Sequence, residues 1–395
     1  MKNMRFLIIA MLGLAFLLAT PDLGNAQFGK LKDKVKKEAE KKLPKPNDSE
    51  KDTASAPEPK TDSSATGGEN FQLYTKFDFV PGQKVLFYDD LSGEELGEFP
   101  SRWNLKTGVF EIAKVGSDAW IMATTHGQIS PKINVNQLPE KYTIEFEFLN
   151  RTSVFAGAPH LEFQWIDANG NWMARLKLYN NTTAYFYMVD DKGNAPEISN
   201  KQLAPAFAKG IHQIRIMVTK SSVKCYVDNE RLVNAPKSTK FAPTNFAIDF
   251  YANANDFELG SFFIRNFRFA EGGKTMREQL DESGHIVTHG IYFDINSDKI
   301  RGESYKTLAD IAQMLTDDTS LKLMIEGHTD SDGNDAANLE LSQRRAESVQ
   351  KYLTDTYKVA TERLQSKGYG ESKPIDANTT PEGKANNRRV ELAKI

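Results

Sequence analysis

The chain has 395 residues, with 50 Lys and Arg against 53 Asp and Glu, 6 His and a single Cys. At about 150 residues per domain, this length predicts two or three domains. Hydrophobic residues make up 39% and charged residues 26%, which excludes a polytopic membrane protein and a wholly disordered chain. A net charge of −3 gives no basic field, which argues against nucleic acid as a partner. One cysteine excludes an internal disulfide framework and a four-cysteine metal site.

The first 26 residues have the three parts of a secretory signal peptide. Lys2 and Arg5 precede an apolar run of 14 residues, 6–19, and small residues follow at 24–26. The alternative is an uncleaved membrane anchor, but this run is short against the ~20 residues that span a bilayer. We therefore expect an exported protein that is cleaved before Gln27, with no cysteine beside that site to carry a lipid anchor.

Residues 27–70 predict a lysine-rich segment followed by a disordered linker. The segment 28–43 carries seven Lys, and its few apolar residues recur at helical spacings of three and four. The stretch 44–70 is rich in Pro, Ser, Thr, Asp and Glu and has no apolar periodicity, so it cannot bury enough surface to repay ordering. We interpret the basic segment as a solvated, partly helical spacer, and contact with anionic lipid or another acidic surface is the alternative.

Residues 71–272 predict a β-sandwich. Several runs alternate apolar and polar residues, as strands with one buried face do: 142–149, 173–178, 213–218, 223–227, 246–251 and 262–269. Turn-forming stretches at 167–171, 190–194 and 228–229 separate them. Many short strands over ~200 residues, without a long amphipathic helix, are typical of two packed sheets. Cys225 lies in one of the runs and is expected to be a small core residue.

Two stretches of this region, 89–103 (DDLSGEELGEFPSRW) and 223–233 (VKCYVDNERLV), resemble segments of concanavalin-like and laminin-G-like jelly rolls. The resemblance covers about residues 78–270 and implies an all-β jelly-roll sandwich of a kind that often binds glycans. Four tryptophans offer faces for sugar stacking, although aromatic residues in a sandwich more often belong to the core. They are Trp103, Trp120, Trp165 and Trp172, and Trp172, which follows a turn, is the best candidate for exposure.

A catalytic sandwich would need two carboxylates directed into one cleft. Glu145 and Glu147 share a strand face, but we interpret them as the solvent-exposed side of a sheet. The stretch 162–164 does not match the E-x-D-x-(x)-E arrangement of jelly-roll glucanases. We therefore predict that the protein is not an enzyme.

The last region, 280–395, is predicted to be a separate domain, and mixed periodicity begins at residue 286. The pattern predicts strands at 290–293, 321–326 and 389–393, helices at 305–315 and 338–353, and a segment 364–368 that leads into a turn. The order β-α-β-α-β predicts a small α/β sandwich with two helices on one face of a sheet.

On the second predicted helix, Arg345 lies within the apolar stripe. At ~100° per residue from Leu341, Arg345 falls at about 40° and Val349 at about 80°, whereas Arg344 lies among solvated positions. A buried charge needs a counter-ion, and Asp330, in the loop that follows the preceding strand, is the nearest candidate. Periodicity leaves two interpretations open. One is an internal Asp330–Arg345 salt bridge, and the other is a trap in which Asp330 binds a ligand ammonium and Arg345 a ligand carboxylate.

The motifs of this region resemble those of the OmpA-like peptidoglycan-binding domain over about residues 286–395. They follow the family's spacing in 291–297 (IYFDINS), 326–333 (EGHTDSDG), 338–353, 368–370 (GYG), 374–375 and 378–391. The resemblance implies a non-catalytic domain that holds the peptidoglycan stem peptide through diaminopimelate, whose free end carries an ammonium beside a carboxylate. The family's acid–base pair falls on Asp330 and Arg345. The same matching implies five further pocket residues: Asn296, Asn338, Arg388, Thr329 and Leu341.

We predict neither a cofactor nor a metal. The lone H-x-D-x-D pattern of His328, Asp330 and Asp332 is a weak metal signature, and the later ligands of a calcium loop are not placed. His285 and His289 have no partner pattern. Residues 280–395 carry 15 basic and 20 acidic residues, which disfavours a general polyanion site.

Together these parts predict an exported cell-envelope protein of a Gram-negative bacterium, located in the periplasm and associated with the outer membrane or the cell wall. Residues 280–395 would bind peptidoglycan and tether the sandwich, which would meet a glycan or an outer-membrane protein. In the alternative, the sandwich binds or hydrolyses a glycan and the wall-binding domain only localises it. A purely structural spacer is the third possibility.

Overall fold

The computed structural model describes residues 77–135, 137–150, 160–179, 183–203, 210–251 and 262–395. The expected signal peptide (1–26) and the lysine-rich segment with its linker (27–70) lie outside the described residues. The described residues belong to one compact unit. Within the described ranges, no helix has the length and apolarity needed to cross a membrane.

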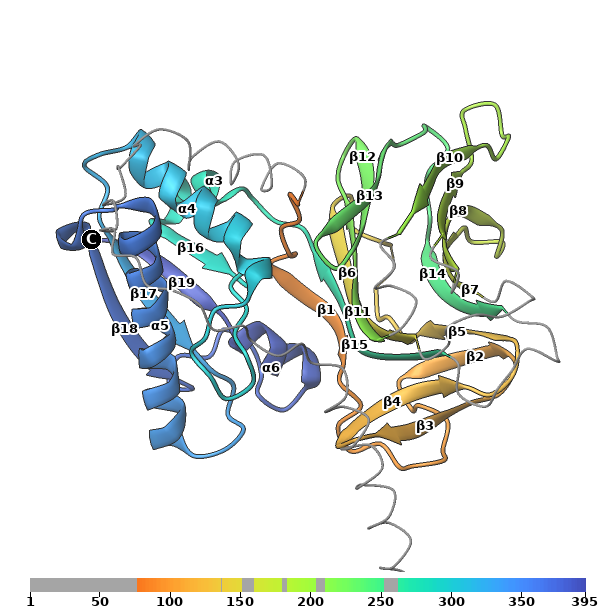
Figure 1. The fold of residues 1–395 in the computed structure, drawn as a ribbon, viewed down its shortest axis with the longest axis horizontal. Coiled ribbons are helices and arrows are strands. Elements are labelled where there is room, and N and C mark those ends of the chain that lie inside the picture. The colour runs from red at the N-terminus through yellow and green to blue at the C-terminus, as the bar shows by residue number, and fades with distance from the viewer. Residues whose placement is uncertain (1–76, 136, 151–159, 180–182, 204–209, 252–261) are drawn as a thin grey trace, which may run out of the picture. The chain divides into compact units, whose positions relative to one another are not determined.

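The described residues from 77 to 271, here called the sandwich, form two antiparallel sheets (Figure 1). The first sheet has the order β13-β12-β11-β6-β15-β4-β3, and β1 also pairs with β15. Its strands are β1 (Lys84–Asp89), β3 (Phe110–Val115), β4 (Asp118–Ala123), β6 (Tyr142–Asn150), β11 (Gly210–Val218), β12 (Ser222–Val227), β13 (Glu230–Pro236) and β15 (Phe262–Glu271).

The second sheet has the order β10-β9-β8-β7-β14-β5-β2. Its strands are β2 (Trp103–Thr107), β5 (Gly127–Pro131), β7 (His160–Ile166), β8 (Trp172–Tyr179), β9 (Thr183–Met188), β10 (Glu197–Gln202) and β14 (Asn245–Tyr251). Inward-facing residues of both sheets contribute to one apolar cluster, so the two sheets share a core. All six strands expected from alternation are present.

Three of the four tryptophans are core residues. Trp103, Trp120 and Trp165 are each at most 1% exposed, so none of them can stack on a sugar. Only Trp172 is partly exposed, and the guanidinium of Arg175 lies 4.2 Å from the centre of its ring. Cys225 is fully buried in the shared core, as expected.

The described residues 276–395, here called the C-terminal region, form a four-stranded sheet of order β16-β19-β17-β18 with helices. The strands are β16 (His285–Thr288), β17 (Leu323–His328), β18 (Leu364–Gly370) and β19 (Val390–Lys394), and only β17 and β18 run parallel. The helices are α3 (Met276–Ser283), α4 (Tyr305–Asp317), α5 (Asp335–Tyr357) and α6 (Pro381–Asn387). Two short 3-10 turns, η3 (Gly302–Ser304) and η4 (Thr361–Arg363), precede α4 and β18.

Three expectations for this region were wrong. The first strand is 285–288, not 290–293, where Phe293 makes only an isolated bridge to Ile300. The segment after residue 364 is a full strand that pairs with β17, because tertiary pairing extends it through Gly368 and Gly370. Helices α3 and α6 were missed because each spans at most eight residues and carries too few apolar positions for a periodic signal.

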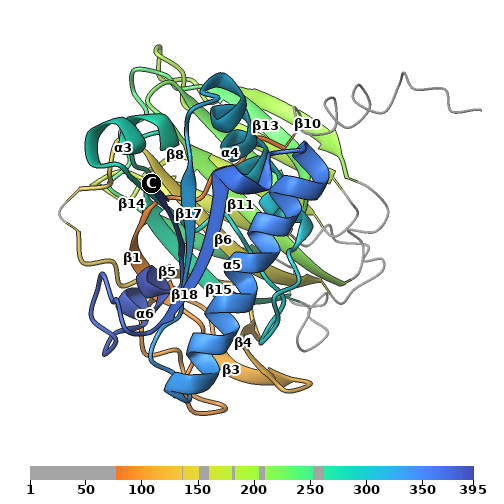
Figure 2. The ribbon, with the colours of Figure 1, turned by 90° about the vertical axis from the view of Figure 1, so that its left-hand side faces the viewer.

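Helix α5 lies close against the sheet because two glycines face it. Gly327 and Gly368 are neighbours across β17 and β18. A methyl group at Gly327 would lie 2.2 Å from the carbonyl oxygen of Ser342, and one at Gly368 would lie 2.3 Å from the amide nitrogen of Gln343. Figure 2 shows α5 running along β18. These glycines therefore set the depth of the helix that carries Arg345.

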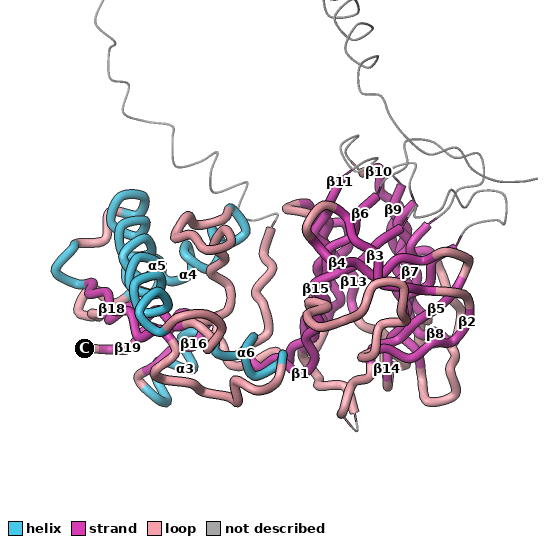
Figure 3. Tube along the Cα trace, turned by 90° about the horizontal axis from the view of Figure 1, so that it is seen from below, coloured by secondary structure: helices cyan, strands magenta, loops and turns pink. Residues whose placement is uncertain are grey.

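Strand β1 is held by the C-terminal region along the edge that does not pair with β15. The backbone N–H of Val85 donates to Asn386 Oδ1 at 2.8 Å, and the backbone N–H of Tyr88 donates to Glu382 Oε1 at 3.0 Å. Both acceptors lie on α6, which sits beside β1 (Figure 3). The sandwich and the C-terminal region thus share a hydrogen-bonded boundary.

The interpretation of Glu145 as a solvent-exposed residue was wrong. Its carboxylate is 6% exposed and accepts from Arg268 at 2.8 Å and from the Tyr292 hydroxyl of the C-terminal region at 2.7 Å. The alternation of β6 correctly separated two faces, but it could not reveal that the polar face is covered by another part of the chain.

Candidate functional site

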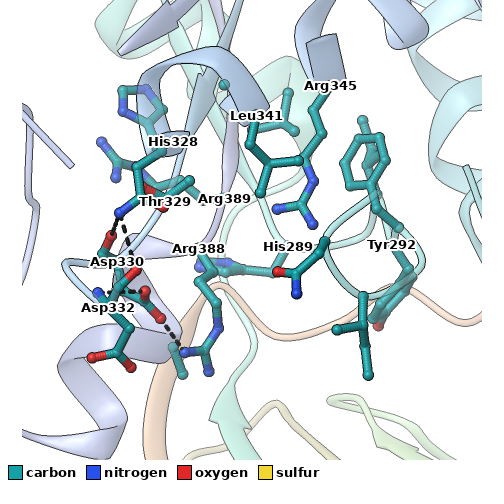
Figure 4. Close-up of a pocket in the computed structure, with 18 of the residues that line it drawn as sticks. His289, Tyr292, His328, Thr329, Asp330, Asp332, Leu341, Arg345, Arg388 and Arg389 are labelled. Carbon is teal, nitrogen blue, oxygen red and sulfur yellow. Dashed lines mark hydrogen bonds and ion pairs between the residues drawn. The ribbon is translucent and has the colours of Figure 1, made fainter. Parts of the chain in front are cut away.

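The seven residues implied by the sequence resemblance line one pocket. It has a volume of about 520 Å³ and is bounded by the loop after β17, the first half of α5, the segment before α4 and the end of α6. Its walls include all of Asn296, Thr329, Asp330, Asn338, Leu341, Arg345 and Arg388. These residues come from four separate stretches of sequence, and Asp330 and Arg345 lie on opposite sides of the pocket (Figure 4).

Asp330 lies two residues after the end of β17 and is only 7% exposed. One carboxylate oxygen accepts from the backbone N–H of Asp332 at 3.1 Å, and the other accepts from the guanidinium of Arg388. A carboxylate has about four acceptor positions, so both oxygens retain capacity for a further donor.

Arg345 is the cation of the pocket that has no carboxylate partner among the described residues. Its Nε donates to the backbone carbonyl of Ser297 at 2.9 Å, and its guanidinium lies 4.9 Å from the centre of the Phe293 ring. Burial lowers the pKa of Arg345, although Asp298 nearby opposes that shift. The remaining N–H donors of the Arg345 guanidinium are directed into the pocket (Figure 4).

The prediction that Arg345 lies within the apolar stripe of this helix was wrong. The buried stripe of α5 runs through Asn338, Ser342, Ala346, Val349 and Leu353, so Arg345 lies at its edge. A small serine and alanine form the contact because glycines bring the sheet close, and polar Ser342 cannot be recognised as a core position by hydropathy. The edge position places the guanidinium at the pocket, where a fully buried position would have pointed it into the sheet.

The other implied residues divide by role. The side-chain amide of Asn338 donates to the backbone carbonyls of Asp330 and Asp332 and to Glu371 Oε2, at 2.7–3.3 Å. Thr329 is 6% exposed, and its hydroxyl has no partner among the described residues. Asn296 has a left-handed backbone (φ 51°) and an exposed side chain at the pocket mouth. Leu341 supplies an apolar wall.

Comparison with known proteins identifies the family of this chain. Residues 292–388 match the family model described as the OmpA family. A peptidoglycan-associated lipoprotein of Buchnera aphidicola is 38% identical over 155 residues, which are 37% of this chain and 87% of that protein. The chain belongs to the OmpA family. The relatives named here are a porin and a lipoprotein.

Other members share only a part of their length with this one. Outer membrane porin F of Pseudomonas aeruginosa is 43% identical over 118 residues, which are 30% of this chain and 31% of the porin. The chain therefore spans about a third of that relative. The crystal structure of the peptidoglycan-associated lipoprotein from Burkholderia pseudomallei aligns at 30% identity and a TM-score of 0.25, covering 27% of this chain and 88% of that one.

Several lining residues of this OmpA-family pocket were not predicted. They include His289, Tyr292, Phe293 and Ile295 of the C-terminal region and Tyr88 and Arg268 of the sandwich. Ile295 had a signal, because an isoleucine in a polar turn is unusual, and it is 91% exposed at the pocket. No sequence signal marked Tyr88 and Arg268, because alternation in a strand does not show which part of the protein covers each face.

Two histidines of the C-terminal region are held neutral. Burial and nearby arginines lower the pKa of His289 to about 3, and its Nε2 lies 3.1 Å from the carbonyl oxygen of Asn386. Burial, Arg389 and Lys373 lower the pKa of His328 to about 3, and its ring stacks on that of Tyr369 at 5.5 Å.

In the part of the chain that the structure describes, His328, Asp330 and Asp332 do not form a group with metal-ligand spacing. Among the described residues, the one group with metal-ligand spacing is Glu326, His328 and Glu391. Arg389 Nε donates to Glu391 at 2.6 Å, so a guanidinium already neutralises one of its carboxylates. An adjacent fixed cation opposes a metal there.

Proposed function

We propose that this protein binds peptidoglycan in the pocket around Asp330 and Arg345 and thereby tethers its β-sandwich to the cell wall. Relatives named as a peptidoglycan-associated lipoprotein and as an outer membrane porin support an envelope role. The observation that carries the proposal is Arg345, a half-buried cation without a carboxylate partner among the described residues, facing Asp330 across the pocket.

The ligand that this arrangement fits is the free end of diaminopimelate in the stem peptide. Its carboxylate would supply the counter-ion that Arg345 lacks, through the two parallel hydrogen bonds of a guanidinium–carboxylate pair. Its ammonium would donate to the open acceptor positions of Asp330. Arg388 would remain on the outer side of Asp330, and Thr329 offers a hydroxyl to the same ligand end.

The test is binding of the full chain to isolated sacculi, measured by co-sedimentation. We expect Arg345→Gln and Asp330→Asn to lower the affinity about 10- to 100-fold, because each removes a charge-assisted hydrogen bond. Arg344→Gln is the matched control, since this neighbour is exposed and pairs with Glu340. Equal pelleting of all variants would reject the site.

A soluble peptide identifies the ligand end. A stem tripeptide that contains diaminopimelate should compete with sacculi, whereas the lysine tripeptide should compete weakly because it has an ammonium but no carboxylate at that end. Equal competition by the two peptides would reject diaminopimelate recognition and leave a general peptide site.

The same proposal includes the organisation expected from the sequence. It comprises a signal peptide at 1–26 for export to the periplasm, a jelly-roll sandwich at 71–272 and a peptidoglycan-binding domain at 280–395. Peptide sequencing of the N-terminus of the mature protein after cell fractionation tests cleavage before Gln27. An N-terminus at Met1 would reject it.

A second candidate function, glycan binding by the sandwich, is favoured by one group of aromatic residues. The guanidinium of Arg175 lies 4.2 Å from the centre of the Trp172 ring and 5.0 Å from that of the Tyr187 ring, on the outward face of the second sheet. Such flat, partly exposed faces suit sugar rings. A glycan array probed with the full chain and with Trp172→Ala tests this, and binding that Trp172→Ala leaves unchanged would reject this group as the site.

A further inference from the structure

Two lining residues of the pocket come from the sandwich, far from the OmpA-family match in the sequence. Tyr88 lies on β1 and Arg268 on β15, and both face the same cavity as Asp330 and Arg345. These strands pair directly, with Tyr88 opposite Arg268 in the register. One wall of the pocket is therefore a piece of β-sheet from the other part of the molecule.

The structure fixes this wall firmly relative to α6. The backbone N–H of Tyr88 donates to Glu382, and Val85, three residues before it, is bonded through its N–H to Asn386 Oδ1. Arg388 follows α6 directly as its C-cap residue. The strand that carries Tyr88 and the helix that ends at Arg388 are thus tied at two points.

Tyr88 supports Arg388, and Arg388 in turn holds Asp330. The Arg388 guanidinium lies 5.1 Å from the centre of the Tyr88 ring, within the range of a cation–π contact. The same guanidinium donates to the Asp330 carboxylate. An aromatic face keeps a planar cation in place without consuming its hydrogen-bond donors, so Arg388 can stay bonded to Asp330.

Arg268 makes the wall rigid. Its two terminal nitrogens donate to Glu145 and to the carbonyl of Gly82, each at 2.8 Å. Glu145 also accepts from the hydroxyl of Tyr292, another pocket residue, at 2.7 Å. A buried carboxylate that joins both parts of the chain fixes the wall at the base of the pocket.

We propose that the sandwich completes the peptidoglycan-binding site, and that Tyr88 is a positioning residue that orients Asp330 through Arg388. The proposal rests on the function proposed above and deepens it. The sandwich is then part of the peptidoglycan-binding site as well as the domain that this site tethers. The affinity for a diaminopimelate peptide therefore depends on Tyr88, a residue about 240 positions before Asp330 in the sequence.

The test is a double-mutant cycle in the full chain, with the diaminopimelate tripeptide as the probe and calorimetry as the measurement. Tyr88→Leu should weaken binding about three- to tenfold, because it removes the aromatic face, and Tyr88→Phe should bind as the wild type does. In the Arg388→Gln background, Tyr88→Leu should have little further effect, since Tyr88 acts through Arg388.

Arg102→Gln is the control for the shared boundary. Arg102 pairs with Glu382 on α6 and lies outside the pocket, so its loss should leave binding within about twofold. Urea unfolding of each variant separates loss of fold from loss of binding. If Tyr88→Leu does not fold, Tyr88→Gln, which suits a half-buried position, replaces it.

The outcomes separate the two proposals. Wild-type affinity in Tyr88→Leu, or effects of Tyr88→Leu and Arg388→Gln that simply add, would overturn the role of Tyr88 even if Arg345→Gln weakens binding as expected. Undiminished binding in Arg345→Gln would instead overturn the proposed function itself.

Discussion

The carboxylate of Asp330 is paired with the guanidinium of Arg388, which lies 58 residues further along the chain. It does not form an ion pair with Arg345 among the described residues, so the internal Asp330–Arg345 salt bridge, one of the two interpretations open from sequence, is not what the structure contains. Asp330 has its counter-ion, and Arg345 is left with a backbone carbonyl and an aromatic ring. The pocket is therefore one anion short.

This imbalance predicts that function and stability oppose each other at residue 345. Replacing Arg345 by Met keeps the apolar stem and removes a half-buried charge, so we expect the free energy of unfolding to rise by ~1 kcal/mol. Binding to sacculi should fall at least tenfold in the same variant. Urea unfolding and co-sedimentation measure the two effects. If Arg345→Met is less stable than the wild type, the hydrogen bond to the carbonyl of Ser297 fully offsets the cost of burying the Arg345 charge.

The close approach of α5 predicts an unusual sensitivity at Gly368. In Gly368→Ala, the added methyl would overlap the backbone of Gln343 and the hydroxyl of Ser342, so the helix must move away from the sheet. We expect a loss of ~2–3 kcal/mol in unfolding free energy, together with weaker peptide binding because Arg345 moves with the helix. Gly302→Ala is the control, since the nearest atom there is 3.7 Å from the new methyl. Equal stability of the two variants would contradict the packing argument.

The two neutral histidines predict that the free energy of unfolding decreases as the pH is lowered. The folded-state pKa of both His289 and His328 is about 3, below the unfolded value of about 6.5, so the unfolded chain binds more protons between these pH values. Stability is fully present above the unfolded pKa and is lost as the pH falls below it. From about pH 7.5 to about pH 5, each histidine should lower the free energy of unfolding by up to about 2 kcal/mol.

Urea unfolding at the two pH values measures this loss. His289→Gln and His328→Gln should each flatten the pH dependence, whereas exposed His285→Gln should leave it unchanged. If the slopes of all three variants match that of the wild type, carboxylates rather than these histidines cause the dependence.

Cys225 predicts a simple probe of the sandwich. It is fully buried, and burial raises the pKa of its thiol, so little thiolate forms in the folded protein. A thiol reagent should modify it rapidly in denaturing urea and negligibly in buffer at pH 8. Because it is the single cysteine of the chain, labelling reports the opening of this core alone. Rapid labelling in buffer would mean that the core of the sandwich opens locally.

Sequence alternation predicted six strands of the two sheets and missed the others, some of them for identifiable reasons. Strand β7 (HLEFQWI) carries His160, Glu162 and Gln164 among its apolar residues, and all but Gln164 of the strand is buried. Burial alone would raise the pKa of Glu162, but hydrogen bonds from His160 and Lys177, with Lys177 at 2.9 Å, and the charge of Arg175 lower it to about 2. At the opposite extreme, β2 and β10 are mostly exposed, so hydropathy gives them no period.

The pocket was predictable as far as its residues share the spacing of a family motif. Asp330 and Arg345 stand out in the sequence because an arginine next to the apolar positions of a helix follows a loop that carries a carboxylate. Which arginine pairs with Asp330 depends on the end of α6, and a helix of seven residues leaves no periodic trace. Tyr88 and Arg268 reach the pocket through tertiary contacts alone, so no local pattern could reveal them.

The hydrogen bonds from the backbone of β1 to Asn386 and Glu382 have a consequence for anyone who divides this chain. They cap the unpaired edge of a sheet, which would otherwise be a template for another strand. A sandwich expressed without α6 would carry that open edge into solution, where it invites self-association. The sandwich is therefore best studied with the C-terminal region attached.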